Sequence, residues 1–247
     1  SPFAFTGNKF EFRMLGSSNS IACANIMLNA AVAESLKIYA DRLENVDDFE
    51  TALHDMIKKT IKDHKRIIFN GDNYSEEWVK EAERRGLPNL KNTMTALHTL
   101  VNEKNVALFE KYGVFSRREL ESRFEIFLEE YHRRIRIEGR LSWEMAATII
   151  LPALRNEYKQ TVSALSRALD AKRTNGTAAL QKLADKLGGA LDSVVSDLDT
   201  LETALTSCHE DILAAMSRLR TSVDAAETLV NDRSWPLPKY REMLFIY

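Results

Sequence analysis

In the segment Asn8-Lys9-Phe10-Glu11-Phe12-Arg13-Met14, near the start of the chain, charged and large apolar side chains alternate strictly from Lys9 onward. Because successive side chains of a strand point to opposite faces, the alternation predicts a β-strand with one apolar face and one charged face. Lys9, Glu11 and Arg13 share the charged face and span roughly 13 Å. The residues that follow, Leu15-Gly16-Ser17-Ser18-Asn19-Ser20, are typical of a turn that leads into a capped helix.

The charged face of this strand has two interpretations. A carboxylate flanked by two cations can hold a divalent metal while its neighbours neutralise phosphate or carboxylate oxygens. Phosphoryl transfer needs such an arrangement because negative charge must be positioned and screened in its transition state. Alternatively, the strand is half-exposed and its charges pair with those of neighbouring strands. The spacing alone does not distinguish the two.

The first 13 residues, Ser-Pro-Phe-Ala-Phe-Thr-Gly-Asn-Lys-Phe-Glu-Phe-Arg, resemble the late catalytic strand of glutamine synthetases in the version carried by the type III branch. The shared order is a basic residue, an apolar one, Glu, an apolar one and Arg, followed by a small-residue loop and a helix. The resemblance implies that Glu11 binds a divalent metal on the ATP side. It further implies that Arg13 faces the substrate glutamate and its γ-phosphoryl intermediate, and that Lys9 contacts a nucleotide phosphate. Two features depart from the pattern: Lys9 stands where many relatives have Arg, and Met14-Leu15-Gly16 replaces Pro-Asp or Pro-Gly.

The composition indicates a mainly helical chain. It has 247 residues with only nine glycines and five prolines, and it is rich in Leu, Ala, Glu and Lys. Its net charge of −2 gives no electrostatic reason to expect nucleic acid, and no apolar run approaches the ~20 residues of a membrane helix. Cys23 and Cys208 are expected to be buried thiols of a reducing cytoplasm. Since Ser1 is not Met and lies within the family motif, we expect a carboxyl-terminal fragment.

Apolar residues at intervals of three and four predict a series of helices after the strand. We expect them over residues 21–43, 48–69, 89–112 (as a pair) and 116–137, with a short helix capped by Ser75. Ser116 and Glu119 form a capping box. The segment from Leu108 to Leu120, Leu-Phe-Glu-Lys-Tyr-Gly-Val-Phe-Ser-Arg-Arg-Glu-Leu, is similar to the end of the glutamine synthetase catalytic domain. The resemblance therefore implies a catalytic-domain portion over residues 1–136.

Residues 137–247 are predicted to form a helical extension. Ser142 is expected to cap a helix that Pro152 kinks. From residue 180 to 230, apolar residues recur at intervals of threes and fours almost throughout, the pattern of a coiled-coil seam. We therefore predict a long antiparallel helical hairpin over about 142–230, closer to a bundle than to an extended rod.

The end of the chain, Trp235-Pro236-Leu237-Pro238-Lys239-Tyr240-Arg241-Glu242-Met243-Leu244-Phe245, is aromatic and proline-rich. The plainest interpretation is a tail that packs back onto its own domain. The type III synthetases end in a similar Trp-Pro-x-Pro-x-Tyr run, which is a third point of resemblance.

Other motifs give little chemistry. The five histidines are scattered, and none is paired with another His or Cys at metal-ligand spacing. Arg133, Arg134 and Arg136 form a small basic cluster that we interpret as an intersubunit or helix-end feature. No Ser/His/Asp set and no Gly-rich phosphate loop is present in the sequence.

The predicted fold is mainly α, with one N-terminal strand left from a catalytic β-sheet, followed by helices and the hairpin. The resemblance implies ATP-dependent ligation of ammonia to glutamate through a γ-glutamyl phosphate, with Mg²⁺ (or Mn²⁺). It also implies a cytoplasmic, ring-based homo-oligomer, without nucleic acid or membrane partners. The fragment alone is expected to be inactive. The alternative is a helical oligomerisation or interaction module without catalysis of its own.

Overall fold

We analysed a computed structural model, which describes residues 3–5, 9–12, 16, 19–72 and 74–244. The prediction of a mainly helical chain is confirmed. The chain divides into two compact units, Ser1–Leu128 and Glu129–Tyr247, and each is described by itself. The expected family boundary at residue 136 stays a prediction, because a division by contacts does not test it.

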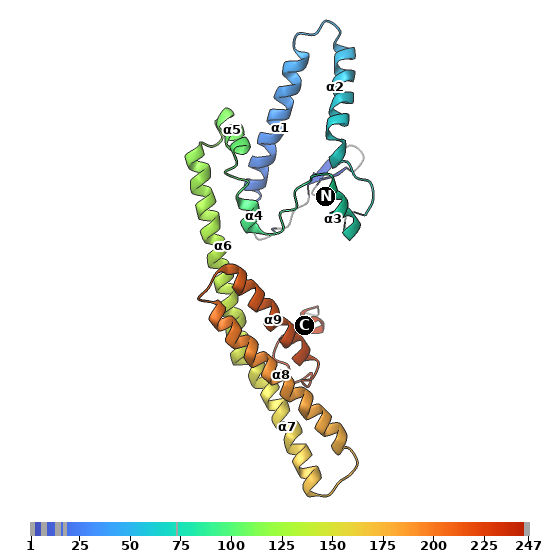
Figure 1. The fold of residues 1–247 in the computed structure, drawn as a ribbon, viewed down its shortest axis with the longest axis vertical. Coiled ribbons are helices and arrows are strands. Elements are labelled where there is room, and N and C mark those ends of the chain that lie inside the picture. Colours follow the sequence, from blue (N-terminus) through green and yellow to red (C-terminus); the bar gives the residue numbers. More distant parts are fainter. Residues whose placement is uncertain (1–2, 6–8, 13–15, 17–18, 73, 245–247) are drawn as a thin grey trace. The chain divides into compact units, whose positions relative to one another are not determined.

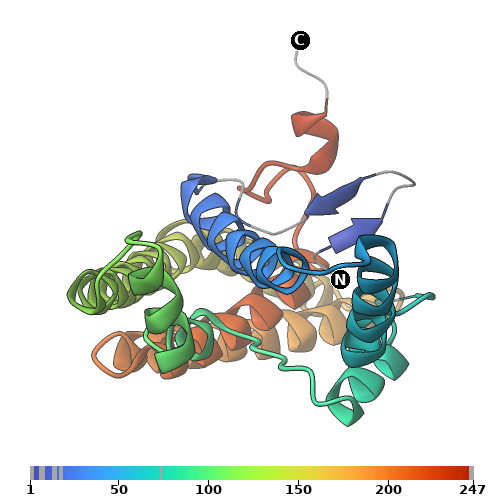
Figure 2. The same ribbon diagram turned by 90° about the horizontal axis from the view of Figure 1, so that it is seen from above.

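The first unit begins with two short strands, β1 (Phe3–Phe5) and β2 (Phe10–Phe12). They are antiparallel and lie side by side, with Ala4 opposite Glu11 (Figure 2). The prediction that β2 belongs to a larger catalytic sheet remains untested. The helices that follow are α1 (Ala22–Leu43), α2 (Phe49–His64), the 3₁₀ turn η1 (Lys65–Ile67), α3 (Glu76–Arg84), α4 (Thr93–Leu97), α5 (Glu103–Lys111) and the start of α6 (Arg117–Met145) (Figure 1).

The core of the first unit is small and lies where α1 meets α5 and α6. Its buried side chains are Ala30, Leu100, Val106, Phe109 and Leu120. A polar contact reinforces the packing of α1 on α5: the Glu34 carboxylate accepts hydrogen bonds from Lys111 Nζ at 2.6 Å and the Tyr112 hydroxyl at 2.7 Å. Helix α1, which follows β2 in the chain, is thus anchored to the end of α5.

Two predicted helix starts in this unit are confirmed. The Ser75 hydroxyl accepts a hydrogen bond from the Trp78 amide at the start of α3. At the start of α6, the Ser116 amide donates to Glu119 Oε2 at 2.8 Å, and the Glu119 amide donates back to Ser116 Oγ. This is the reciprocal capping box that the sequence predicts.

The second unit begins within α6, which continues farther than expected. The prediction that Ser142 caps a new helix is wrong, because α6 runs to Met145 and passes directly into the π-helix η2 (Ala146–Ile150) and α7 (Leu151–Asp170). Pro152 is the second residue of α7, which directly follows the π-helix, so its missing amide hydrogen falls where regular α-helical bonding is already interrupted. Gly139 does not stop α6 because helix packing requires a glycine there: an added Cβ would lie 2.8 Å from Ile212 Cγ2.

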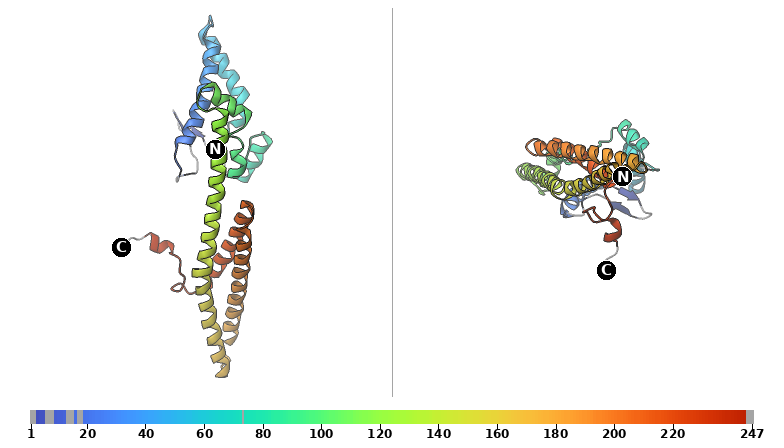
Figure 3. Two further views of the ribbon diagram at one scale, coloured as in Figure 1. Left: turned by 90° about the vertical axis from the view of Figure 1, so that its left-hand side faces the viewer. Right: turned by 90° about the horizontal axis from the view of Figure 1, so that it is seen from below.

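The predicted hairpin is really a bundle with an additional chain reversal. The periodic run from residue 180 to 230 is divided between α8 (Thr177–Ala204) and α9 (His209–Glu227). Ser222 Oγ donates to Asp197 Oδ2 across the pair, so α9 runs antiparallel to α8. Figure 3 shows both helices alongside the run from α6 to α7. The predicted antiparallel packing of α7 and α8 is found, whereas the reversal between α8 and α9 is an addition that the periodicity did not indicate.

The core of the second unit is filled by the seam residues. Leu154, Leu187, Val194, Leu201 and Ile212 are completely buried. Trp235 joins them and is 7% exposed, so the tail packs back onto its own unit, as the plainer interpretation predicted. The short helix α10 (Tyr240–Met243) follows.

The prediction that both cysteines are buried is wrong. Cys23 and Cys208 are free thiols, but both are exposed and not buried. Cys208 lies at the chain reversal, where it is the N-cap residue of α9 and so falls outside the seam. Among the residues that the structure describes, none of the helices combines the length and apolar character needed to cross a bilayer.

Candidate functional site

The predicted charged strand is described only in part. Glu11 lies in the middle of β2 and is half-buried, and Lys9 is exposed just before the strand begins. Arg13 lies outside the described residues, so its place on the same face stays a prediction. The alternation of a strand puts Lys9 and Glu11 on one side, about 7 Å apart along the chain direction. This arrangement suits binding of an anion and a cation next to each other.

The fit of a divalent metal to this strand can be judged from the available ligands. A hard cation such as Mg²⁺ takes an octahedral set of oxygens, several of them from water or substrate phosphates. Glu11 offers one carboxylate. Among the residues that the structure describes, no group of three or more His, Cys, Asp or Glu side chains is placed to hold a metal. Glu11 therefore fits as one ligand of a shared site, but the described part of the chain does not build that site by itself.

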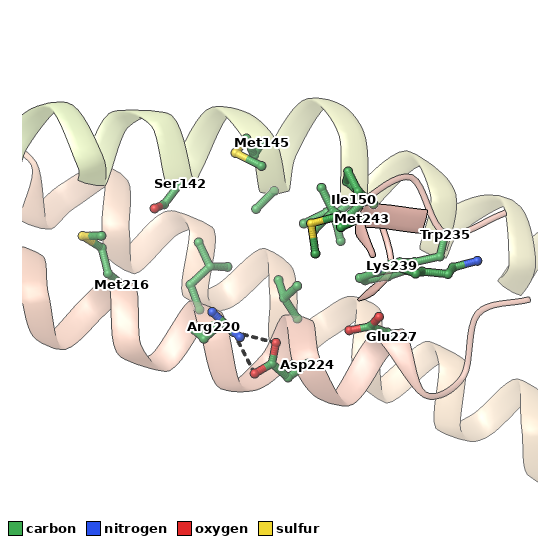
Figure 4. Close-up of a pocket in the computed structure, with 15 residues that line it drawn as sticks. Ser142, Met145, Ile150, Met216, Arg220, Asp224, Glu227, Trp235, Lys239 and Met243 are labelled. Atoms are coloured by element: carbon green, nitrogen blue, oxygen red, sulfur yellow. Dashed lines mark hydrogen bonds and ion pairs between the residues drawn. The ribbon is translucent and has the colours of Figure 1, made fainter. Parts of the chain in front are cut away.

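The second unit contains a cavity of about 440 Å³ between the turn of η2, helix α9 and the tail (Figure 4). Its apolar wall includes Ile150, Met216 and Trp235. Its polar rim includes Arg220, whose Nε donates to both carboxylate oxygens of Asp224 at 2.7 and 2.8 Å. Trp235, Leu237 and Pro238 of the tail line this cavity, which is therefore the place where the tail docks.

The docked tail is held by polar contacts as well as by Trp235. Lys239 Nζ forms an ion pair with Asp232 Oδ1 at 2.8 Å, and the Asn231 amide donates to Glu157 Oε2 on α7 at 3.4 Å. The Trp235 amide donates to the Asn231 carbonyl.

Comparison with known proteins places the chain in a family. Residues 52–170 match the family described as glutamine synthetase C-terminal domain. Along its whole length, the chain is 35% identical to the type-3 glutamine synthetase of Dictyostelium discoideum, over 266 aligned residues. The chain belongs to the glutamine synthetase family.

Bacterial glutamine synthetases show the same relationship. The identity is 34% to the glutamine synthetase of Butyrivibrio fibrisolvens and 33% to that of Bacteroides fragilis strain YCH46, over 99% of this chain in both cases. The chain spans 36% or 37% of each of these three relatives, or about a third of their length. The C-terminal domain match begins after the candidate strand, whereas the alignment to the Dictyostelium glutamine synthetase includes it.

The structure also brings together residues that sequence reasoning missed. The rings of His132 and His209 stack with their centroids 4.8 Å apart, and Tyr131 meets the edge of His209 at 5.5 Å. His209 Nε2 lies 3.1 Å from Glu210 Oε1. His132 and His209 are far apart in the sequence, so no spacing rule would have joined them. Stacked rings present faces and not nitrogens to each other, which does not favour chelation of a metal between them.

Proposed function

We propose that this chain forms part of an ATP-dependent glutamate–ammonia ligase. In this reaction the γ-carboxylate of glutamate accepts the terminal phosphoryl group of ATP, and ammonia then displaces phosphate to give glutamine. The observation that carries the proposal is the alignment of the chain, from end to end, with glutamine synthetases at 33–35% identity. Because the chain spans about a third of these relatives, the activity is proposed for a longer protein that contains it.

Three charged residues of the N-terminal segment are proposed to act in this reaction. Lys9 would neutralise a phosphate of the nucleotide, and Arg13 would hold the carboxylate and phosphoryl oxygens of the substrate through its planar guanidinium. Glu11 would supply one ligand to Mg²⁺ or Mn²⁺, with the remaining ligands provided by other parts of the longer protein. When bound, the cation reduces the charge of the phosphates and orients them. The strand's contribution is thus to position opposite charges at the reacting phosphate.

The half-buried position of Glu11 supports this assignment. A carboxylate at the surface of a strand that is partly shielded from water interacts more strongly with a cation than a fully solvated one does. Lys9 is exposed, so its cation lies at the surface of this segment.

The second unit is proposed to be a structural support of a cytoplasmic, ring-based homo-oligomer. The alternative function is an assembly module without catalysis. Such a module would have to pair subunits through a surface other than the seam. The seam residues Leu187, Leu201 and Ile212 are buried within the unit's own bundle, so they are not available to pair subunits. Ile137 and Leu141 on α6 are 59% and 53% exposed and offer an apolar surface for such contacts. Light scattering of the 247-residue chain distinguishes a monomer from an assembly.

The proposed activity is tested by measuring glutamine formation from glutamate, ammonia and ATP by the longer protein. We expect turnover that requires all three substrates and a divalent cation, and none from the 247-residue chain alone. Arg13→Lys should raise the glutamate KM or lower kcat, because a point charge replaces a bidentate donor. Lys9→Met should raise the KM for ATP. A longer protein that makes no glutamine under any of these conditions would refute the proposal, and unchanged kinetics in both variants would refute the site assignment.

A further inference from the structure

A second charged feature lies on α6, within the second unit. A groove of about 510 Å³ is lined there by His132, Arg133, Arg136 and Arg140, together with Glu129, Ile137 and Leu205, which directly follows α8. Arg133, Arg136 and Arg140 follow one another at intervals of three and four, so they lie on one face of the helix. The volume falls within the range of roughly 300–1,000 Å³ that is common for small-ligand sites.

The charges of this groove are incompletely balanced. On the same helix, Arg133 forms an ion pair with Glu129 at 2.7 Å. Arg134, which does not line the groove, forms one with Glu130 at 2.8 Å. Within the part of the chain that the structure describes, Arg136 and Arg140 form no ion pair.

The residue four positions earlier explains why two of these arginines are in ion pairs and the other two are not. Arg133 and Arg134 each follow a glutamate by four positions, whereas Arg136 follows His132 and Arg140 follows Arg136. Like charges one turn apart repel and weaken a helix. The chain therefore keeps an arrangement that is unfavourable for its own stability, and a bound anion would relieve the repulsion.

His132 adds a polar atom without a partner to the same groove. Its Nε2 is buried and makes no hydrogen bond, although buried ring nitrogens are normally paired. Stacking on His209 holds the ring in place. Because this nitrogen is shielded from water, the groups that a ligand in the groove would meet are the exposed guanidinium groups of Arg136 and Arg140.

We propose that this groove binds a small multivalent anion that carries phosphate or carboxylate groups. Arg136 and Arg140 would donate from their guanidinium groups, which match the planar geometry of both kinds of oxyanion. This inference rests on Arg136 and Arg140 of α6 and on the groove that Leu205 helps to line, and it is independent of the roles given to Lys9, Glu11 and Arg13.

The test is isothermal titration calorimetry of the 247-residue chain at about 50 mM salt, where surface charges are only moderately screened. Pyrophosphate and citrate are titrated separately, because the first represents phosphate ligands and the second carboxylate ligands. We compare the wild type with the double variant Arg136→Ala/Arg140→Ala. A control, Arg134→Ala/Arg155→Ala, removes the same charge from exposed positions outside the groove lining.

Binding of either anion by the wild type and the control, with affinity at least about tenfold lower in the groove variant, supports the proposal. The anion that binds identifies the kind of ligand. No binding of either anion by the wild type, or an equal loss in the groove and control variants, overturns it. Arg136→Gln/Arg140→Gln serves as a second groove variant that keeps side-chain length, and circular dichroism verifies that all variants keep the helix content of the wild type.

Discussion

Helix α6 approaches α9 closely at Gly139, and this packing decides whether Gly139→Ala raises or lowers the free energy of unfolding of the second unit. Gly139→Ala would normally stabilise a helix by about 0.5–1 kcal/mol, because alanine loses less backbone entropy than glycine. Here the added Cβ would lie 2.8 Å from Ile212 Cγ2 and 3.0 Å from Leu205 Cδ2. Both distances are shorter than ordinary contacts between carbon atoms, which are about 3.5–4.0 Å.

The size of the effect follows from which neighbour can move. Leu205 Cδ2 is the end of a flexible side chain and can rotate away. Ile212 Cγ2 is attached directly to a branched Cβ that has few rotamers in a helix, and its residue is completely buried. Overpacking of this kind costs about 1–3 kcal/mol. After subtracting the gain in helix propensity, we expect Gly139→Ala to lower the free energy of unfolding of the second unit by ~1 kcal/mol.

The matched control is Gly189→Ala in α8, where nothing lies within 4 Å of the added Cβ. It should raise the free energy of unfolding by about 0.5–1 kcal/mol. In a Trp78→Phe background, the remaining tryptophans, Trp143 and Trp235, both lie in the second unit and report its unfolding in urea. The free energy of unfolding falls by about 2 kcal/mol per M urea, so the urea midpoint of Gly139→Ala should lie below that of the parent and the midpoint of Gly189→Ala above it. The two midpoints should differ by roughly 1 M. Stabilisation by both substitutions would refute the close packing of α6 on α9.

Two more predictions concern one unit each. Leu201→Ala should lower the free energy of unfolding of the second unit by about 3 kcal/mol, because Leu201 is 0% exposed and its removal leaves a cavity. In the same tryptophan assay, the control Val195→Ala, at a position 42% exposed, should lower it by less than about 1 kcal/mol. Equal losses in the two variants would contradict the assigned core. In the first unit, hydrogen bonds from Arg84 and Arg85 lower the pKa of Glu81 to about 2 from an ordinary value of 4.5. The unfolded carboxyl binds its proton first as the pH falls, so the stability that Glu81 contributes is complete above pH 4.5 and is lost as the pH falls from 4.5 toward 2. An NMR titration should find the Glu81 midpoint near 2, Glu81→Gln should remove this part of the pH dependence of unfolding, and a midpoint near 4.5 would contradict the two arginine contacts.

Local signals predicted much of the helical structure. The caps at Ser75 and Ser116 depend on hydrogen bonds between residues three positions apart, so the sequence contains all the information they need. The seam residues from 180 to 230 are apolar at regular intervals because they fill the core of the bundle, and this was visible without any structure.

The chain reversal before α9 could not be predicted in the same way. Leu201, Leu205, Cys208 and Ile212 keep intervals of threes and fours through the turn, so the periodicity continues where the helix does not. At Ser142 the sequence predicted a helix start where none occurs. Serine is a good capping residue, but α6 continues through Ser142, and Gly139 nearby packs closely on α9. In both places tertiary packing overrides the local signal.

The candidate site was only partly accessible to sequence reasoning. Alternation and family resemblance together singled out Lys9, Glu11 and Arg13. In contrast, the groove on α6 and the stack of His132 on His209 depend on contacts between distant segments, and a count of histidine spacings had no means of detecting them.

The central claim is that the N-terminal strand brings Glu11 to the metal and nucleotide of a glutamine synthetase. The most direct measurement is glutamine formation by the longer protein with Glu11→Gln, which keeps the size of the side chain and removes its charge. We expect turnover to fall by about 100-fold or more, while thermal unfolding and the activity of a control, Glu125→Gln on the exposed surface of α6, stay at the wild-type level. Turnover of Glu11→Gln within about twofold of the wild type would contradict the claim.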